Sequence, residues 1–102
     1  MLAGKEDLAL QRVMAVKVQS DMEQPGTLFY LVHRVLDDGV NPGNKLFFYE
    51  CYADEAAKEA HLNCSSWQAL VAGWSDCFAG SLSDVTPVFL DRISGFVHVQ
   101  AP

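Results

Sequence analysis

The stretch that decides the fold is residues 27–53, "TLFYLVHRVLDDGVNPGNKLFFYECYA". Two apolar runs rich in β-branched and aromatic residues, 27–36 and 46–53, flank a segment rich in Asp, Gly, Asn and Pro. Such runs are typical of strands, and the segment between them is typical of a turn. We therefore expect an antiparallel hairpin closed by a long loop over residues 37–45.

Side chains alternate along a strand, which divides this hairpin into two faces. In the first strand Leu28, Tyr30 and Val32 point one way, and Phe29, Leu31, His33 and Val35 point the other. In the second strand Leu46, Phe48, Glu50 and Tyr52 share one face, and Phe47, Tyr49 and Cys51 share the other. Both faces are mainly apolar, so both need a cover. Helices of the same chain can cover one face, and a second copy that packs sheet to sheet is the simplest cover for the other.

Helical patterns flank the hairpin. In residues 4–26, "GKEDLALQRVMAVKVQSDMEQPG", acidic residues occupy the first turn and Pro25 ends the run. The apolar residues at helical spacing in this run are Leu10, Val13, Met14 and Val18. After the hairpin, Asp54 is a favourable N-cap for a helix over residues 55–64. A second helical stretch, residues 67–80, lines up Trp67, Leu70, Val71, Trp74 and Phe78 and ends at Gly80.

The C-terminal region offers two short strand candidates, "VTPVFLDRI" at 85–93 and "FVHVQ" at 96–100. The expected order is then helix, strand, strand, helix, strand. Helices grouped beside an antiparallel sheet give an α+β fold. The pattern is that of a ferredoxin-like sheet with helices on one face and its first strand missing.

Composition limits the function classes. The 102 residues are the size of one domain, 1–102, and their formal net charge of −6 argues against nucleic acid and anionic membrane surfaces as partners. No apolar run approaches the roughly 20 residues of a membrane span, and no signal-peptide pattern is present, so we expect no membrane and a cytoplasmic location. Cys51, Cys64 and Cys77 are widely spaced and, with three histidines, indicate no metal site.

Four short motifs occur in order along the chain. They are Glu23 with Pro25 and Gly26, then Tyr30 with His33, then Tyr49 with Glu50 and Tyr52, then Ala60 with His61. The series is similar to the antibiotic biosynthesis monooxygenase family, which includes quinol monooxygenases and autoinducer-processing enzymes. Its usual pattern is a helix ending in E-P-G, a strand with Y-x-x-H, a strand with Y-E-x-W/Y and a helix with A-H-x-x-x-x-H-F. The resemblance covers residues 4–88.

The chain departs from this pattern in four places. Gln24 is inserted between Glu23 and Pro25, and Ser66 stands where the family often has a second histidine. The family's first strand should precede residue 4, where only three residues remain. The tail, residues 93–102, is additional, and we hypothesise that "FVHVQ" fills the gap left by the missing strand.

The resemblance implies a dimeric α+β barrel, a homodimer formed through the sheet face. It also implies oxidation of a small aromatic, quinol or quinone-like ligand by dioxygen, with no metal, flavin or other cofactor. Such chemistry needs a base with a pKa near neutrality, hydrogen-bond donors for a phenolate and aromatic walls. The residues that suit these roles are His61, Glu50 and His33 as catalytic groups, and Tyr30, Tyr52, Trp67 and Trp74 around the substrate.

Each of these residues also has a structural interpretation. His61 lies on a helical stripe of Ala and Cys residues and could simply pack there. Glu50 could pair with His33 or Arg34, and His33 is structural if its face is the dimer face. The tyrosines and tryptophans could all belong to the core.

Three functions are therefore open. The first is a cofactor-independent monooxygenase acting on a small aromatic or quinol substrate. The second is a non-catalytic dimeric α/β-barrel protein with a binding or stress-response role, which the missing histidine and strand favour. The third is a haem-binding relative, for which the sequence offers only His61 with Trp67 or Trp74.

Overall fold

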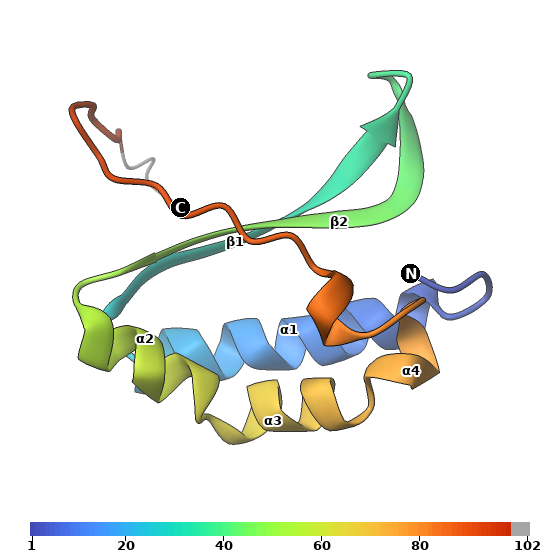
Figure 1. The fold of residues 1–102 in the computed structure, drawn as a ribbon, viewed down its shortest axis with the longest axis horizontal. Coiled ribbons are helices and arrows are strands. Elements are labelled where there is room, and N and C mark those ends of the chain that lie inside the picture. The colour runs from blue at the N-terminus through green and yellow to red at the C-terminus, as the bar shows by residue number, and fades with distance from the viewer. Residues whose placement is uncertain (99–102) are drawn as a thin grey trace.

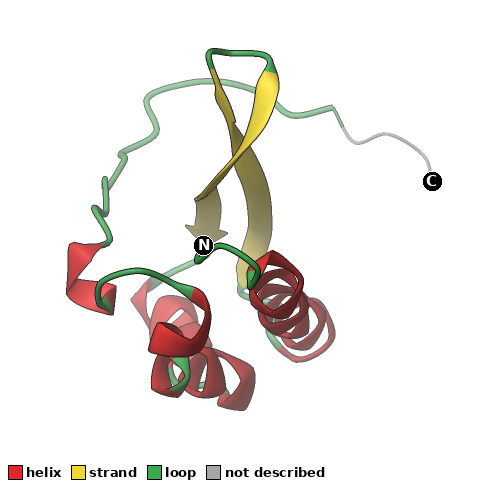
Figure 2. Ribbon diagram, turned by 90° about the vertical axis from the view of Figure 1, so that its right-hand side faces the viewer, coloured by secondary structure: helices red, strands yellow, loops and turns green. Residues whose placement is uncertain are grey.

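The computed structural model describes residues 1–98. Its elements, in chain order, are α1 (Glu6–Glu23), β1 (Thr27–Asp37), β2 (Asn41–Tyr52), α2 (Glu55–Leu62), α3 (Ser65–Ala72), α4 (Trp74–Cys77) and a 3-10 turn (Leu82–Asp84). Figures 1 and 2 show two layers, with the helices together on one side of a twisted hairpin. The α+β class and the helices on one face of an antiparallel sheet are confirmed.

The hairpin has the expected faces but a much shorter turn. Tyr30 pairs with Glu50 and His33 with Phe47 in an antiparallel register, so the face with Tyr30 and Val32 joins the face with Phe48 and Glu50. The expected direction of Leu28 is wrong, because the register shifts between Thr27 and Phe29 and Leu28 is 58% exposed. The long loop is wrong, because β2 already begins at Asn41. Asp38 and Gly39 both have positive φ, and the Asp38 carboxylate accepts hydrogen bonds from the backbone of Val40 and Asn41. This side chain closes the turn tightly and lets the Pro42-Gly43 segment join the strand.

The two predicted C-terminal strands are wrong where the structure describes them. Residues 85–98 contain no strand, and residues 99 and 100 of "FVHVQ" lie outside the described residues. A strand needs a partner edge, and this segment pairs with neither β1 nor β2 within the described residues. Figure 2 shows it as a loop that arches across the hairpin. Its side-chain contacts with the rest of the described chain include Arg92 beside the Cys51 thiol and Lys58 over the Phe89 ring. Its apolar side chains are therefore exposed, Phe89 by 80% and Ile93 by 96%.

The core lies between α1, α3 and the inner hairpin face. Val13, Val16 and Leu70 are buried there, and the hairpin and helices add a partly buried shell of Tyr30, Val32, Leu46, Phe48, Trp67 and Phe78. The inward face of α1 consists of Ala9, Val13, Val16 and Ser20. Of the expected apolar stripe of α1 only Val13 is buried, because the small and β-branched side chains face inward, while Met14 and Val18 are exposed.

The later helices are shorter than expected. Asp54 caps α2 by accepting a hydrogen bond from the backbone of Ala57, as predicted. The second stretch begins earlier, at Ser65, and is divided at Gly73 into α3 and α4. At this break the Arg12 guanidinium donates to the Gly73 carbonyl and pairs with Asp76 at 3.1 Å, which ties α1 to both helices.

The outer hairpin face remains uncovered in the described chain. Leu31 is 48% exposed and Phe47 57% exposed, and the rings of Phe29 and Tyr49 stack at 5.1 Å on this face. Within residues 1–98, no helix is long and apolar enough to cross a membrane.

Candidate functional site

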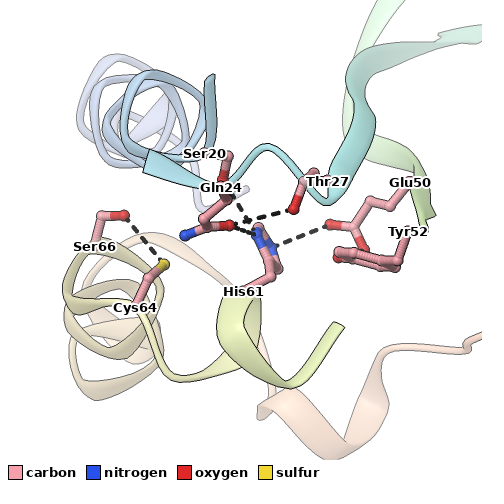
Figure 3. Close-up of polar contacts among 8 residues, drawn as sticks. All are labelled: Ser20, Gln24, Thr27, Glu50, Tyr52, His61, Cys64 and Ser66. Carbon is pink, nitrogen blue, oxygen red and sulfur yellow. Dashed lines mark hydrogen bonds and ion pairs between the residues drawn. The ribbon is translucent and has the colours of Figure 1, made fainter. Parts of the chain in front are cut away.

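His61 lies at the centre of the candidate site, at the junction of α1, α2 and the hairpin (Figure 3). It is in the last turn of α2 and is only 1% exposed. The stripe predicted for this helix explains why it points inward, towards the end of α1. A histidine buried this completely has fixed partners for at least one ring nitrogen.

The Nδ1 atom of His61 is held by two residues of α1 and its end. It lies 3.0 Å from Gln24 Oε1 and 3.2 Å from Ser20 Oγ. Gln24 Oε1 also accepts a hydrogen bond of 3.3 Å from the Thr27 hydroxyl. A carbonyl oxygen only accepts, so the contact with Gln24 Oε1 is a hydrogen bond when the hydrogen of the neutral ring is on Nδ1.

The Nε2 atom of His61 faces the hairpin. It lies 3.8 Å from Glu50 Oε1, too far for a hydrogen bond, and has no hydrogen-bond partner among the described residues. The other carboxylate oxygen of Glu50 accepts a 3.1 Å hydrogen bond from the Tyr52 hydroxyl. A chain of polar groups therefore runs from Tyr52 through Glu50 to the open nitrogen of His61.

Aromatic rings surround the imidazole. The ring centroids of Tyr30, Tyr52 and Trp67 lie 5.4, 5.5 and 6.0 Å from that of His61. The Tyr30 hydroxyl is buried and, like His61 Nε2, has no hydrogen-bond partner within residues 1–98. Unpartnered polar atoms in an apolar surrounding are costly, so two of them on rings 5.4 Å apart indicate a place where a ligand or water binds.

Burial sets the protonation states of this cluster. It lowers the pKa of His61 below its ordinary value, which keeps the ring neutral at physiological pH. Burial also raises the pKa of Glu50, an effect that the hydrogen bond from Tyr52 partly offsets. The pKa values of Tyr30 and Tyr52 are raised by burial and then by the nearby Glu50 carboxylate, so both phenols keep their protons.

His61 itself is closed to solvent, whereas Glu50 is exposed and Tyr30, Tyr52 and Trp67 are partly buried. A hollow of about 520 Å³ lies on the outer side of α1, where Met14, Val18 and Met22 meet the start of α3, and His61 is not in its wall. A second hollow of about 220 Å³ lies between α1 and β1, and its wall includes Ser20 and Tyr30, two neighbours of His61. A ligand could thus approach the cluster from this second side, although His61 itself does not line the hollow.

Two predicted site residues lie elsewhere. His33 is on the outer hairpin face, where its ring lies 6.3 Å from that of Phe47, and the sheet separates it from His61. Trp74 begins α4 and stacks on Phe78 at 4.4 Å. The structure thus brings together His61, Glu50, Tyr30, Tyr52 and Trp67, and it leaves His33 and Trp74 out of the cluster.

Ser66, at the position of the second family histidine, has a structural role. Its backbone N–H donates to Gln19 Oε1 at 2.9 Å, and its hydroxyl donates to the same oxygen. Gln19 of α1 therefore holds the start of α3. This contact occupies Ser66 on the side of α1 and not on the side of His61.

Sequence reasoning missed the two residues that hold Nδ1. Ser20 follows Val13 and Val16 on the buried face of α1, so a polar residue on an apolar stripe was its only signal. Gln24 stood out only as an insertion in the E-P-G motif. Both become partners of His61 only when the end of α1 meets α2 in the folded chain.

Within the described residues, no group of three or more His, Cys, Asp or Glu side chains is placed to hold a metal ion. No protein-family model, no curated protein and no solved structure matches the chain. The resemblance to the antibiotic biosynthesis monooxygenase family therefore depends on the sequence motifs alone.

Proposed function

We propose that the chain is an antibiotic biosynthesis monooxygenase-like protein that oxidises a small aromatic or quinol substrate with dioxygen and without a cofactor. One observation carries the proposal: the unpartnered Nε2 of a neutral, buried His61 lies among Glu50, Tyr30 and Tyr52. The motifs Y-x-x-H, Y-E-x-Y and A-H supply all four of these positions from the sequence resemblance. Trp67 adds an aromatic wall.

The groups divide the chemistry between them. His61 Nε2 accepts a phenolic proton from the substrate, and the Tyr30 hydroxyl donates a hydrogen bond to the resulting phenolate. The electron-rich anion then reacts with dioxygen. A quinol and dioxygen together give a hydroxyquinone and water, so the substrate supplies all the electrons and no external reductant is needed. Glu50 takes part through its position 3.8 Å from Nε2, where it stabilises the imidazolium after proton transfer.

Oxygen uptake with a panel of quinols in air tests this proposal. His61→Gln and Glu50→Gln should each lower the rate by about a hundredfold, the usual contribution of a general base. His98→Gln is the matched control, because His98 is exposed in the C-terminal segment, where its ring lies against that of Phe96. If both variants keep the wild-type rate on a substrate that the wild type oxidises, the assignment of the base is wrong.

A second candidate function is supported by the burial of His61. His61 is 1% exposed and lies in the wall of neither described hollow, which favours a non-catalytic binding or stress-response protein. Calorimetric binding of a quinone without any oxygen uptake from the corresponding quinol would support this candidate against the first.

We also propose that the protein works as a dimeric α+β barrel, with the outer hairpin faces of two copies packed together. The exposed face with Leu31, Phe47 and the Phe29–Tyr49 stack supports this, since it is an apolar sheet face without a cover. Sedimentation equilibrium should give twice the chain mass of 11.2 kDa. A monomer at all concentrations would contradict the barrel.

A further inference from the structure

We propose that Gln24 is a positioning residue that fixes His61 in the tautomer with hydrogen on Nδ1, leaving the lone pair on Nε2. The catalytic meaning of this tautomer rests on the proposed monooxygenase function. The tautomer itself can be measured without any substrate. An experiment can therefore contradict the role of Gln24 without contradicting the monooxygenase function, and the reverse.

The backbone of Gln24 is anchored at the end of α1. Its N–H donates to the Ser20 carbonyl at 3.1 Å, and its own carbonyl accepts from the Thr27 N–H at 3.0 Å. These bonds end the helix and begin the turn into β1. The side chain of Gln24 therefore leaves the backbone at a fixed point, and it is only 9% exposed.

The side-chain amide of Gln24 meets two donors. Its Oε1 lies 3.0 Å from His61 Nδ1 and accepts the Thr27 hydroxyl hydrogen at 3.3 Å. A carbonyl oxygen has lone pairs and no hydrogen, so the imidazole must donate. Ser20 Oγ, at 3.2 Å from Nδ1, is a second acceptor for the same hydrogen.

The tautomer decides whether the cluster holds a base. With hydrogen on Nδ1, the lone pair of Nε2 points into the space shared with Glu50 and the two tyrosines, as Figure 3 shows for Glu50 and Tyr52. With hydrogen on Nε2, the ring would have no lone pair there to accept a substrate proton. The titratable groups around the ring are Glu50 and Tyr52 from β2 and Tyr30 from β1, and none of them touches Nδ1.

Gln24, the residue inserted in the E-P-G motif, thus has a specific structural role. Gln24 separates Glu23 from Pro25 and is the side chain that reaches the histidine of α2. Gln24 directly follows the last residue of α1 and supplies the acceptor. Ser20 and Thr27 support it from either side.

The test is the nitrogen spectrum of the full chain labelled with ¹⁵N-histidine. At about pH 8 the ring of His61 is neutral, and long-range ¹H–¹⁵N correlations distinguish the protonated from the free ring nitrogen. The signals of His61 are assigned by removing the other two histidines with His33→Gln and His98→Gln. We expect a protonated Nδ1 and a free Nε2. A protonated Nε2 in the wild type overturns the inference.

Two variants and a control extend the test. Gln24→Leu should move His61 towards hydrogen on Nε2 and lower kcat about a hundredfold, with KM changed by less than about twofold. Gln24→Glu keeps an acceptor, so it should keep hydrogen on Nδ1 and raise the pKa of His61 by about one unit. Gln11→Leu, the same substitution at an exposed position of α1, should change neither spectrum nor rate.

The outcomes separate the two proposals. A protonated Nδ1 in the wild type, lost in Gln24→Leu, supports the role of Gln24 even where no quinol is oxidised, and that result contradicts only the monooxygenase function. An unchanged tautomer in a folded Gln24→Leu variant overturns the role of Gln24. If circular dichroism shows that Gln24→Leu is unfolded, two other measurements test the role of Gln24. They are the ¹⁵N spectrum of the wild type and the pKa of His61 in Gln24→Glu.

Discussion

The inner and outer faces of the hairpin have similar compositions, but the inner face packs against the helices and the outer face is exposed. Neighbouring residues such as Leu31 and Val32, or Phe47 and Phe48, point to opposite faces of the same strands. The inner members pack against the core formed by the helices. The outer members are about half exposed, Leu31 by 48% and Phe47 by 57%.

The same contrast separates two histidines. His61 on the inner side has two partners at Nδ1, three aromatic neighbours and a pKa lowered by burial. His33 on the outer side also lies against an aromatic ring, that of Phe47, but is exposed. The comparison shows that a histidine beside an aromatic ring is not enough to define the candidate site. The site is defined by the helices that cover the inner face, and the outer face has no such helices over it in the described chain.

The largest expected effect comes from placing a charge on each face in turn. Val32→Lys buries an ammonium group beside the core and should lower the free energy of unfolding by about 3–5 kcal/mol, which leaves the chain largely unfolded. Leu31→Lys, one residue away, places the charge on the outer face. It should leave the circular dichroism spectrum native and shift the sedimentation of a dimer to that of a monomer.

The control for this pair is Leu31→Ala, which removes apolar surface from the outer face without adding charge. It should weaken self-association less than Leu31→Lys does. If Leu31→Lys sediments like the wild type, the outer face is not the dimer interface. If Val32→Lys is as stable as the wild type, the distinction between the faces itself is wrong.

The second effect compares the two histidines. His61→Leu leaves Gln24 and Ser20 without their shared partner, so the free energy of unfolding should fall by about 1–3 kcal/mol in urea titrations at pH 8. His33→Leu should change it by less than about 0.5 kcal/mol, because the side chain is exposed. Equal losses in the two variants would mean that the contacts at Nδ1 contribute nothing to stability.

Much of the fold could be predicted from the sequence. The alternation of apolar residues in 27–36 and 46–53 was enough for the hairpin and its faces, because period-two patterns are local. Asp54 as a cap and the inward direction of His61 also follow from local spacing. The length of the turn did not follow, since it depends on the Asp38 side chain bonding to the backbone of Asn41.

The buried face of α1 was harder to predict from the sequence than the hairpin. Leu10, Val13, Met14 and Val18 were the predicted stripe, yet Ala9, Val13, Val16 and Ser20 are the buried residues of α1. Small and β-branched side chains let α1 pack closely against α3 and the hairpin, and that choice depends on the neighbours. The partners Ser20 and Gln24 were missed for the same reason, since their contact with His61 joins residues 41 and 37 positions apart.

The third effect is the pH dependence of His61. Burial lowers its pKa in the folded chain below the ordinary value of 6.5, so the unfolded chain takes up a proton first as the pH falls. The stability that the neutral ring contributes is therefore complete above pH 6.5 and is lost between 6.5 and the lowered pKa. The free energy of unfolding should fall over this window by no more than about 1.4 kcal/mol per pH unit.

The measurement for this effect is a set of urea titrations from pH 8 to pH 5 on the wild type and His61→Leu. The difference in stability between the two should shrink as the pH falls below 6.5, because only the wild type carries the ring. A constant difference between wild type and His61→Leu would show that burial does not perturb this histidine.

The smallest effect concerns Glu50, the carboxylate of the inner face. Burial raises its pKa above the ordinary value of 4.5 in the folded chain, so its contribution to stability is complete below pH 4.5 and is lost as the pH rises through the raised value. Glu50→Gln keeps an acceptor for the Tyr52 hydroxyl and removes the charge. The variant should be more stable than the wild type by about 0.5 kcal/mol at pH 7 and should lose this advantage at pH 4. Glu59→Gln on the exposed side of α2 controls for net charge alone, and the same gain there would show that the inner face does not penalise the carboxylate of Glu50.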